Sequence, residues 1–414
     1  MKNKLLVIAN YFYPEVASTG QILTELCENI TDKYDVTVIC AVPCYTGKIE
    51  EKYKKKKLYF EKYKDISVIR VRVSEFDKKN KLSRVKHILS YFFNSIRAIK
   101  KSGKQDVVFT ISQPPILGGM LGVIAKKNKK AKLIYNIQDF NPEQVLAVKY
   151  SKIKLITNLM MFFDKRTCKK SDLIITVGND MKETLNKRFN NKNVPTNIVI
   201  NNWIDEKEIY PLEKNNKKII EFKEKYNMND KFIIMYSGNV GLYYDLENII
   251  KIMGNLAKKD VIFAFIGEGA VKNELQKYVN DNNLNKYFRF IPYQDKKDLI
   301  YSLNSADVHL VTNSKGIKGV SVPSKIYGVM ATNVPILGIL EKDSEAWNLI
   351  EKSDCGCLAE TGDYVQIEQK LSDIIKNKEN FTKKHLTGRK YLEEYLTKDK
   401  SIEKYKNAIK KIIK

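Results

Sequence analysis

Short runs of consecutive apolar residues alternate with longer amphipathic stretches along nearly the whole chain of 414 residues. Short apolar runs bounded by turn residues are typical of strands buried on both faces of a parallel sheet, and the stretches between them have helical spacing. In the first half of the chain these strands are predicted at 5–9, 36–41, 107–112, 133–138, 173–177 and 198–202. Strands that alternate with helices predict an α/β fold with a doubly wound sheet.

A second series of alternating strands and helices follows, with strands predicted at 232–237, 261–266, 288–291, 307–311, 335–340 and 356–359. A chain of this length exceeds one ordinary hydrophobic core, so the two series predict two Rossmann-like domains that face each other across a cleft. The stretch 203–229, which contains Pro211 and the polar run 213–218, is predicted to be the hinge between them. Ligands of such folds bind beyond the carboxyl ends of the strands.

The stretch 319–338 carries the strongest chemical signal. Pro323 suits the first turn of a helix, so Ser324 and Lys325 fall in the same turn. The helix is expected to bury positions 326, 329 and 330 and to end at Asn333. Unpaired N–H groups at a helix start, together with a lysine ammonium, form a site for an anion such as a diphosphate. The alternative is an ordinary strand–loop–helix unit with Lys325 on the surface.

Two other strands of the second half also end in loops of small or polar residues. One loop contains Ser237, Gly238 and Asn239 and leads to a helix that starts near Asp245, and the other contains Gly267, Glu268 and Gly269. A single loop with a glycine is weak evidence, because any turn between a strand and a helix can use one. Three such loops at the same edge of one sheet predict a pocket for a nucleotide diphosphate.

The first half has two candidate sites at strand ends. Thr19, Gly20 and Gln21 stand where a helix over about 21–31 is predicted to begin, and small residues there can admit a phosphate or sugar group close to the backbone. Asp139 and Glu143 follow another strand, and Asp139 could orient a sugar hydroxyl or assist proton transfer. The alternative role of Asp139 is that of a helix cap or turn former.

The composition adds a large excess of positive charge. Lysine and arginine number 73 against 48 aspartates and glutamates, which gives a formal net charge of +25. Such a charge indicates an anionic partner, which is a nucleic acid, a membrane surface or an acidic ligand. The alternative is a genome bias toward lysine and asparagine that has no functional meaning.

The remaining composition excludes several classes of protein. Six cysteines are scattered along the chain, which predicts reduced thiols in the cytoplasm and not a disulfide framework. The apolar runs are too short for a signal peptide or a membrane span. Neither a zinc-type spacing nor an Asp-x-Asp cluster is present, so we expect no metal and no cofactor.

Basic and aromatic residues are interleaved in three stretches of the first half. The run 52–64 precedes a strand at 66–73 whose alternation predicts an exposed or edge position. Helices predicted over about 82–101 and 153–170 have aromatic faces flanked by lysines and arginines. This pattern is typical of helices on an anionic membrane surface, and it predicts a peripheral protein on the cytoplasmic side of the inner membrane. A buried helix with snorkelling lysines has the same pattern.

With these motifs in order along the chain, the sequence resembles the retaining family-4 glycosyltransferases of the GT-B architecture. It is most similar to the L-fucosamine transferase-like branch that serves O-antigen and capsule assembly. The resemblance rests on residues 11–15 with 19–21, 138–139 with 141–143, 236–241, 265–269, and 322–328 with Pro335. It therefore covers essentially the whole chain.

The resemblance implies a nucleotide-sugar donor in a C-terminal domain (204–394) and an acceptor in an N-terminal domain (1–203), to which residues 395–414 return as a crossing helix. The implied donor is a UDP-sugar, with an N-acetylated amino sugar. The implied acceptor is a polyprenyl-diphosphate-linked saccharide or other glycan. Lys325 and Asp139 are the catalytic candidates, and the substrate-binding candidates are Thr19, Gly20, Gln21, Glu143, Ser237, Gly238, Asn239, Gly267, Glu268, Gly269, Tyr293, Pro323 and Ser324.

Two features of the family pattern are missing. Val320 and Gly328 occupy the positions of two glutamates that many members place near the donor. Asn239 stands where an arginine is usual, and no lysine follows it before Lys251. By the resemblance, the diphosphate charge is then met by Lys325, helix starts and backbone amides. Retention without a carboxylate nucleophile implies attack from the side of the leaving group, with the leaving phosphate taking the acceptor proton.

Two other functions fit parts of the sequence. A nucleic-acid-binding protein would explain the charge and the run 52–64, but the chain has no recognition helix, zinc finger or RNP-type motif, so no nucleic-acid partner is expected. An epimerase built from two Rossmann-like domains would consume a UDP-sugar without any acceptor.

Overall fold

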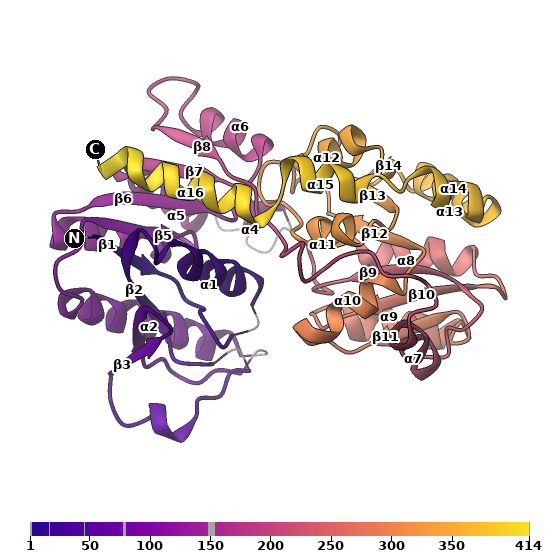
Figure 1. Ribbon diagram of the computed structural model, residues 1–414, viewed down its shortest axis with the longest axis horizontal. Helices are drawn as coiled ribbons and strands as arrows, with labels where there is room; N and C mark the ends of the chain where they lie inside the picture. Colours follow the sequence, from indigo (N-terminus) through magenta and orange to yellow (C-terminus); the bar gives the residue numbers. More distant parts are fainter. Residues whose placement is uncertain (1, 16, 45, 78–79, 148–153, 414) are drawn as a thin grey trace. The chain divides into compact units, whose positions relative to one another are not determined.

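The computed structural model describes residues 2–15, 17–44, 46–77, 80–147 and 154–413 (Figure 1). The chain forms two compact units, Met1–Asn201 with Ser401–Lys414 and Asn202–Lys400. Each unit is a twisted sheet with helices on both faces. The alternation of apolar runs with helical stretches therefore gives two doubly wound α/β domains, as predicted.

The sheet of the first domain has eight strands in the order β3-β4-β2-β1-β5-β6-β7-β8. Apart from β3, which runs antiparallel to β4, neighbouring strands are parallel. The strands are β1 Asn3–Ile8, β2 Tyr34–Ala41, β3 Leu58–Tyr63, β4 Ile66–Val71, β5 Val107–Ile111, β6 Lys132–Ile137, β7 Leu173–Thr176 and β8 Asn197–Val199. The order reverses between β1 and β5, which is the switch point where ligands of such sheets bind.

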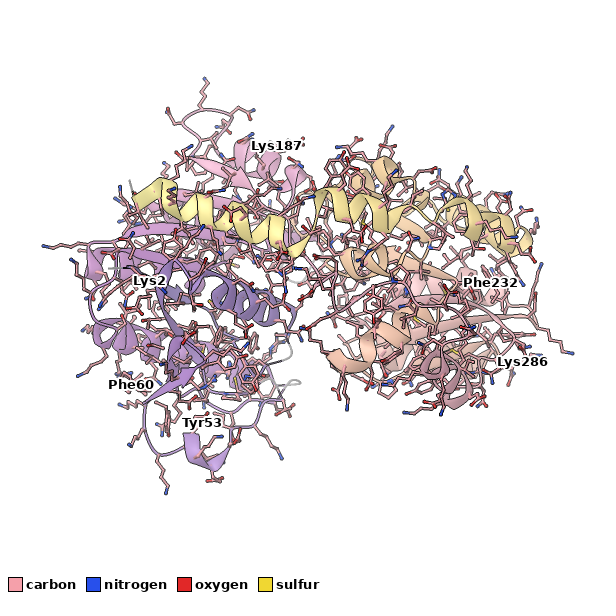
Figure 2. The ribbon with its side chains drawn as sticks, viewed as in Figure 1. Lys2, Tyr53, Phe60, Lys187, Phe232 and Lys286 are labelled. Atoms are coloured by element: carbon pink, nitrogen blue, oxygen red, sulfur yellow. The ribbon has the colours of Figure 1, made fainter. Side chains whose placement is uncertain are left out.

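One strand prediction was wrong. The strand expected at an exposed edge, β4, lies between β3 and β2 and is buried along most of its length. The edge belongs to β3, which lies within the basic run 52–64, and the short helix η1 Glu51–Tyr53 overlaps the start of that run. Alternation alone could not show this, because β3 pairs with β4 in a hairpin that closes at Lys64 with a positive φ of 51°. Tyr53 and Phe60 both lie at this edge (Figure 2).

The helices of the first domain are α1 Ser18–Ile30, α2 Lys81–Lys101, α3 Leu117–Lys129, α4 Glu143–Ala147, α5 Lys154–Lys170 and α6 Asn179–Arg188. α2 begins where the Asn80 side chain accepts hydrogen bonds from the amides of Leu82 and Ser83. α1 begins at Ser18, three residues before the predicted start, so Thr19–Gln21 form its first turn. The predicted start of α5, Ile153, and the loop residue Val16 lie outside the described residues.

The last helix, α16 Lys398–Ile413, returns to the first domain (Figure 1). The Tyr405 hydroxyl lies 3.1 Å from the Asn136 amide nitrogen of β6, which donates to it, and the Tyr405 ring packs edge-on against Phe109 of β5. Lys406 pairs with Asp32 at 3.0 Å. The predicted crossing of the C-terminal helix back to the first domain is therefore confirmed.

The sheet of the second domain has six parallel strands in the order β11-β10-β9-β12-β13-β14. The strands are β9 Phe232–Ser237, β10 Val261–Ile266, β11 Phe288–Ile291, β12 Val308–Thr312, β13 Ile336–Leu340 and β14 Gly356–Glu360. Each lies within one residue of its prediction at either end, because a continuous apolar run is the direct mark of a strand covered on both faces. The switch point of this sheet lies between β9 and β12.

The helices of the second domain are α7 Lys217–Lys225, α8 Leu246–Asn255, α9 Lys272–Asp281, α10 Lys296–Asn304, α11 Lys325–Thr332, α12 Glu345–Ser353, α13 Tyr364–Lys376, α14 Lys378–Lys384 and α15 Gly388–Tyr395. The polar run 213–218, within the stretch predicted to be the hinge, lies in this compact unit. Lys214 Nζ donates to the carbonyl of Ala306 at 2.7 Å, and Asn216 caps α7. In the sequence this polar run resembles a linker, because the residues that it contacts are remote in the chain.

Candidate functional site

Loops from opposite sides of the switch point in the second domain are joined by hydrogen bonds. The Ser314 amide, after β12, donates to the carbonyl of Tyr243, after β9, at 2.7 Å. The Thr312 hydroxyl donates to the carbonyl of Tyr244 at 2.9 Å. The β9–α8 and β12–α11 loops therefore form one continuous rim at the carboxyl ends of the strands, which is where ligands of this topology bind.

The glycines of the two predicted phosphate loops are explained in part by packing. The loop after β9 and the loop after β10 extend the sheet pairing, with the Val240 amide donating to the Glu268 carbonyl at 2.9 Å. A Cβ on Gly267 would lie 2.0 Å from the Gly238 carbonyl oxygen, and one on Gly269 would lie 2.0 Å from the Val240 carbonyl oxygen. These two glycines are thus required for the loops to approach each other, whether or not a ligand binds.

Gly238 has a different neighbour. Its backbone has a φ of +145°, and a Cβ there would lie 3.2 Å from Cε and 3.5 Å from Nζ of Lys325. Glycine at this position therefore leaves room for the lysine amine beside the backbone at the end of β9. Of the predicted residues, the structure brings together the loops that hold 237–239, 267–269 and 323–325 at one rim of one sheet.

The Lys325 side chain points inward, so its alternative interpretation as a surface lysine is wrong. Its Nζ atom is buried and has no hydrogen-bond partner among the described residues. The nitrogen lies 3.7 Å from the ring centroid of Tyr236 and 4.0 Å from that of Tyr244. Burial lowers the pKa of this amine well below its usual value. A buried cationic group without a partner is costly to fold around, which marks it as a candidate for function.

The helix that carries Lys325 differs in register from its prediction. α11 begins at Lys325, Ser324 is its N-cap without a side-chain hydrogen bond to the helix, and Pro323 precedes the cap. Proline still favours this start, because its fixed φ suits the residues just before a helix as well as the first turn. The predicted buried face and the end at Asn333, which is in the left-handed region, are as expected.

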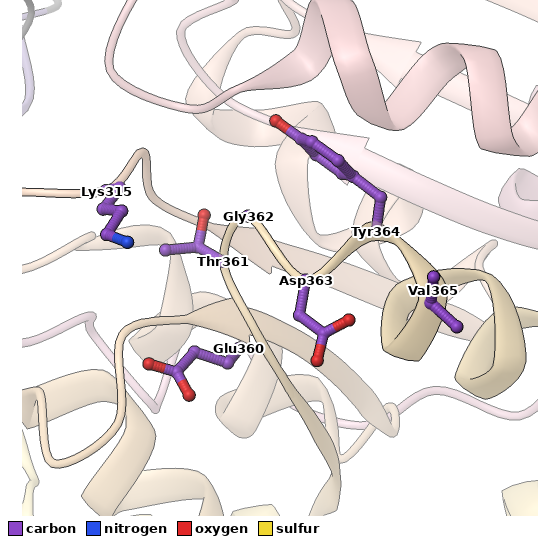
Figure 3. A pocket seen from close by; sticks show the side chains of 7 residues that line it. All are labelled: Lys315, Glu360, Thr361, Gly362, Asp363, Tyr364 and Val365. Carbon is purple, nitrogen blue, oxygen red and sulfur yellow. The ribbon is translucent and has the colours of Figure 1, made fainter.

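A hollow of about 480 Å³ opens beside this rim (Figure 3). Lys315 of the β12–α11 loop and residues 360–365 at the end of β14 line it. The Tyr364 hydroxyl lies 3.1 Å from Asp245 and accepts a hydrogen bond from Asn248 at 2.9 Å, so the hollow is connected to the start of α8. Tyr293, which follows β11, is 49% exposed on the other side of the switch point.

Glu268 is paired with Lys272, a residue that no sequence motif had singled out. Lys272 Nζ lies 2.7 Å from a Glu268 carboxylate oxygen and 3.0 Å from the Gly267 carbonyl. This pair has helical i,i+4 spacing at the start of α9, so the structure accounts for Glu268 by a local ion pair as well as by ligand binding.

In the first domain Asp139 lies two residues after the end of β6, and its carboxylate accepts hydrogen bonds from two side-chain amides. Gln113 Nε2 donates to its carboxylate at 3.1 Å and Gln144 Nε2 at 3.2 Å, while the Ser112 hydroxyl accepts from the Asp139 amide at 3.2 Å. Ser112 and Gln113 follow β5, the strand at the switch point. The carboxylate is thus held by side chains from two loops at the edge where a ligand would bind.

Glu143 is held in an ion-pair network inside the first domain. Arg188 Nε and Nη2 donate to its two carboxylate oxygens at 2.6 and 2.5 Å. Arg188 Nη1 also bonds Asp164, and the guanidinium stacks 4.2 Å from the Phe140 ring centroid. This network was not predicted, because its members come from three separate segments of the chain, around residues 140–143, 164 and 188.

Gly20 has a packing role within the first turn of α1. A Cβ there would lie 3.1 Å from Cβ of Tyr11, and its carbonyl accepts the Thr24 hydroxyl at 2.8 Å. Thr19 and Gln21 are both half-buried. α1 has no side-chain cap at its start, which directly follows the loop after β1 at the switch point of the first sheet.

Two further findings concern metals and membranes. Among the described residues no group of three or more His, Cys, Asp or Glu side chains could hold a metal ion. In the same part of the chain no helix combines the length and apolar character needed to cross a bilayer.

The two doubly wound domains, with the C-terminal helix returned to the first, define the GT-B fold. Solved structures agree with this class. Sucrose-phosphate synthase of Thermosynechococcus elongatus superposes with a TM-score of 0.77 at 12% identity over 99% of both chains. Alr3699/HepE of Anabaena, in complex with UDP and glucose, gives 0.72 at 12% identity over 99% of this chain and 100% of that one.

Sequence comparisons also indicate an activity. Residues 217–391 match the family model described as glycosyl transferases group 1. WbjE of Pseudomonas aeruginosa, which is named as a glycosyltransferase, is 27% identical over 72% of this chain and 74% of its own length. WcaI of Escherichia coli (strain K12), named for colanic acid biosynthesis, is 24% identical over 84% of this chain and 86% of its own. These matches support a glycosyltransferase of the GT-B fold.

Proposed function

We propose that this protein transfers a sugar from a UDP-sugar to a polyprenyl-diphosphate-linked or other glycan acceptor during bacterial surface polysaccharide assembly. The observation that carries this proposal is the Lys325 amine, buried and unpartnered at the switch point of the second domain. A diphosphate is the anion that the surrounding glycine loops and helix starts suit best. The names of WbjE and WcaI and the UDP bound by Alr3699/HepE support the same assignment.

The proposed roles follow the two domains. The second domain binds the donor through Gly238, Asn239, Ser324 and Lys325, and Lys325 stabilises the charge that develops on the departing diphosphate. The first domain binds the acceptor, and Asp139, held by Gln113 and Gln144, orients an acceptor hydroxyl. With no metal required, the anomeric configuration is retained by attack from the side of the leaving group. The donor sugar is an N-acetylated amino sugar.

UDP and UDP-sugars are expected to raise the melting temperature more than GDP, ADP or their sugars do, because binding to the folded state stabilises it by mass action.

The purified protein should transfer an N-acetylated amino sugar to a lipid-linked acceptor, and the rate should be the same with and without EDTA. NMR of the product should show that the anomeric configuration of the donor sugar is retained. Loss of transfer in EDTA that manganese restores contradicts the metal claim, and an inverted product contradicts retention. Consumption of UDP-sugar without acceptor would indicate an epimerase.

We further propose that the protein binds the cytoplasmic face of the inner membrane through its first domain. α3 packs against both α2 and α5, so these three helices form one layer on the sheet. α2 exposes Leu82, Val85, Leu89 and Phe93 along one stripe, and α5 exposes Leu155, Ile156, Leu159 and Phe162. Phe92, in contrast, packs against the core.

The charges on this layer of helices are almost all positive. α2 contains no acidic residue, and the one acidic residue of α5, Asp164, is buried in the Arg188 pair. Lysines and arginines next to an anionic surface contribute about 1 kcal/mol each, and exposed apolar side chains insert at the headgroup level. The combination of an apolar stripe with unopposed positive charge suits an anionic bilayer better than another protein surface of mixed charge.

Sedimentation with liposomes tests the membrane proposal. The protein should pellet with anionic vesicles at low salt, pellet less at high salt because exposed charges are screened, and remain in the supernatant with neutral vesicles. The double variant Phe93→Ser/Phe162→Ser should reduce pelleting by about tenfold or more, since each removes roughly 1–2 kcal/mol of apolar burial. Leu386→Ser, at a 52% exposed site of the second domain, is the matched control and should have no effect. Wild-type protein that stays in the supernatant with anionic vesicles contradicts the proposal.

A further inference from the structure

The Lys325 amine rests against two aromatic faces, which we name the tyrosine pair, Tyr236 and Tyr244. Their ring centroids are 6.0 Å apart and the rings are inclined by 61°, so Nζ touches both faces at 3.7 and 4.0 Å. Neither ring offers a hydrogen-bond acceptor to the amine from its face. The two ring faces therefore confine the amine by packing, and they would attract its protonated form by about 0.5–2 kcal/mol.

Both rings are fixed by the loops of the switch point. Tyr236 is fully buried in β9, and its hydroxyl donates to the Asn239 carbonyl at 2.7 Å. The Tyr244 carbonyl accepts the Thr312 hydroxyl from β12. Because these bonds join the same loops that form the rim, the position of the amine is tied to the geometry of the rim.

The groups that face Lys325 Nζ carry no negative charge. They are Tyr236 from β9 and Tyr244 from the loop before α8, and burial, with a smaller contribution from Tyr244, raises the pKa of Tyr236 well above its usual value. Burial is the cause of the lowered pKa of Lys325, to which no carboxylate of the described chain contributes. An anion brought to the rim would change this balance, because opposite charge nearby favours the protonated amine.

We propose that Tyr236 and Tyr244 are positioning residues which hold the Lys325 amine at the rim, and that binding of a nucleoside diphosphate there is accompanied by uptake of a proton from solvent onto Lys325 Nζ. This inference rests on the proposed donor site. The neutral amine gains one proton to become an ammonium, and the ammonium then pairs with the diphosphate. Affinity for the diphosphate therefore falls as pH rises, since the bound state holds more protons than the free state.

Titration calorimetry with UDP in buffers of different ionisation enthalpy measures this proton. At about pH 8 the terminal phosphate of UDP is already ionised, since its second pKa is about 6, so uptake reports on the protein. The wild type should take up a substantial fraction of a proton, to a limit of about one per UDP bound. Lys325→Met should bind UDP more weakly and without uptake.

The tyrosine pair is tested with two substitutions of one residue. Tyr244→Phe keeps the aromatic face and should retain proton uptake. Tyr244→Leu removes the aromatic face and lets water reach the amine, so Lys325 is already protonated before UDP binds. UDP should therefore still bind, but with much less proton uptake. A loss of folding alone would change the affinity for UDP but would not produce this difference in proton uptake between the two variants.

The possible outcomes distinguish a failure of the proton-uptake inference from a failure of the proposed donor site. UDP that binds the wild type without proton exchange overturns the inference and leaves the donor site intact. Uptake that persists in Lys325→Met also overturns it, because another group then titrates. A protein that binds no UDP overturns the proposed function itself.

Discussion

Replacing Lys325 with methionine is expected to reduce sugar transfer by roughly 10²–10³-fold, which is the usual effect of removing one charge-stabilising group from a water-excluded site. The fold should survive, because methionine approximates the lysine stem and the tyrosine pair accepts an apolar group. Removal of a buried amine without a partner should leave the melting temperature unchanged or raise it. Steady-state transfer and thermal unfolding of the same preparations measure both effects.

The matched control is Lys217→Met, since the Lys217 side chain is 90% exposed on α7 of the same domain. This variant should match the wild type in both assays. Burial lowers the pKa of Lys325 in the folded state, so unfolding of the wild type takes up a proton. The wild type is therefore stabilised as pH rises toward the ordinary lysine pKa of about 10.4, and the stabilising effect of Lys325→Met should shrink over the same range. Transfer at the wild-type rate in Lys325→Met would show that the lysine has no part in the reaction.

Replacing Arg188 with leucine is expected to cost about 3–5 kcal/mol of the free energy of unfolding, because it breaks a buried ion pair and leaves one partner behind. Arg188 is 7% exposed and Asp164 is 2% exposed. Asp164 would retain the Tyr135 hydroxyl at 2.7 Å as a donor but no positive charge. Glu143 would lose both of its bonds to the guanidinium and could turn to solvent, since a fifth of its side chain is exposed.

Urea unfolding followed by circular dichroism measures this loss, with Arg166→Leu as control on the exposed surface of α5. The control should change stability by less than about 0.5 kcal/mol. Burial raises the pKa of Asp164, and Arg188 opposes that rise. Without the arginine the pKa of Asp164 rises further. The loss of unfolding free energy in Arg188→Leu should therefore be smallest at low pH, where Asp164 is protonated in both proteins, and should grow as pH rises through the folded-state pKa of Asp164. A deficit under about 1 kcal/mol at neutral pH would show that the network contributes little.

The class of fold and the order of its strands and helices could be predicted from the amino-acid pattern. Continuous apolar runs such as 232–237 and 261–266 marked buried parallel strands to within a residue, because such a run has few other stable environments. The same pattern located the loops that carry Gly238, Gly267 and Lys325, since these loops follow strand ends in the chain. Their meeting at one rim followed from the parallel direction of the strands.

Tertiary structure alone decided what those residues touch. The inward direction of Lys325 depends on Tyr236 of β9 and on Gly238 and Tyr244 of the loop that follows it. These residues are remote in the sequence, so no local pattern distinguishes Lys325 from a surface lysine. A signal was available in the aromatic residues on either side of the first glycine loop, but periodicity attributes such residues to the core. Likewise, the position of β4 inside the sheet depends on its hairpin partner β3, which was not recognised as a strand within the basic run 52–64.

The Arg188 network shows the same limit for charged residues. Arg188, Glu143 and Asp164 each occur in polar helical segments and look like solvated surface positions in the sequence. Arg188 and Asp164 are buried, and only a fifth of the Glu143 side chain is exposed. Arg188 pairs with both carboxylates, and only paired charges can be withdrawn from water in this way. Apolar periodicity is a property of neighbouring residues and can be read from the chain, whereas charge pairing joins distant residues and is fixed only when the domain has folded.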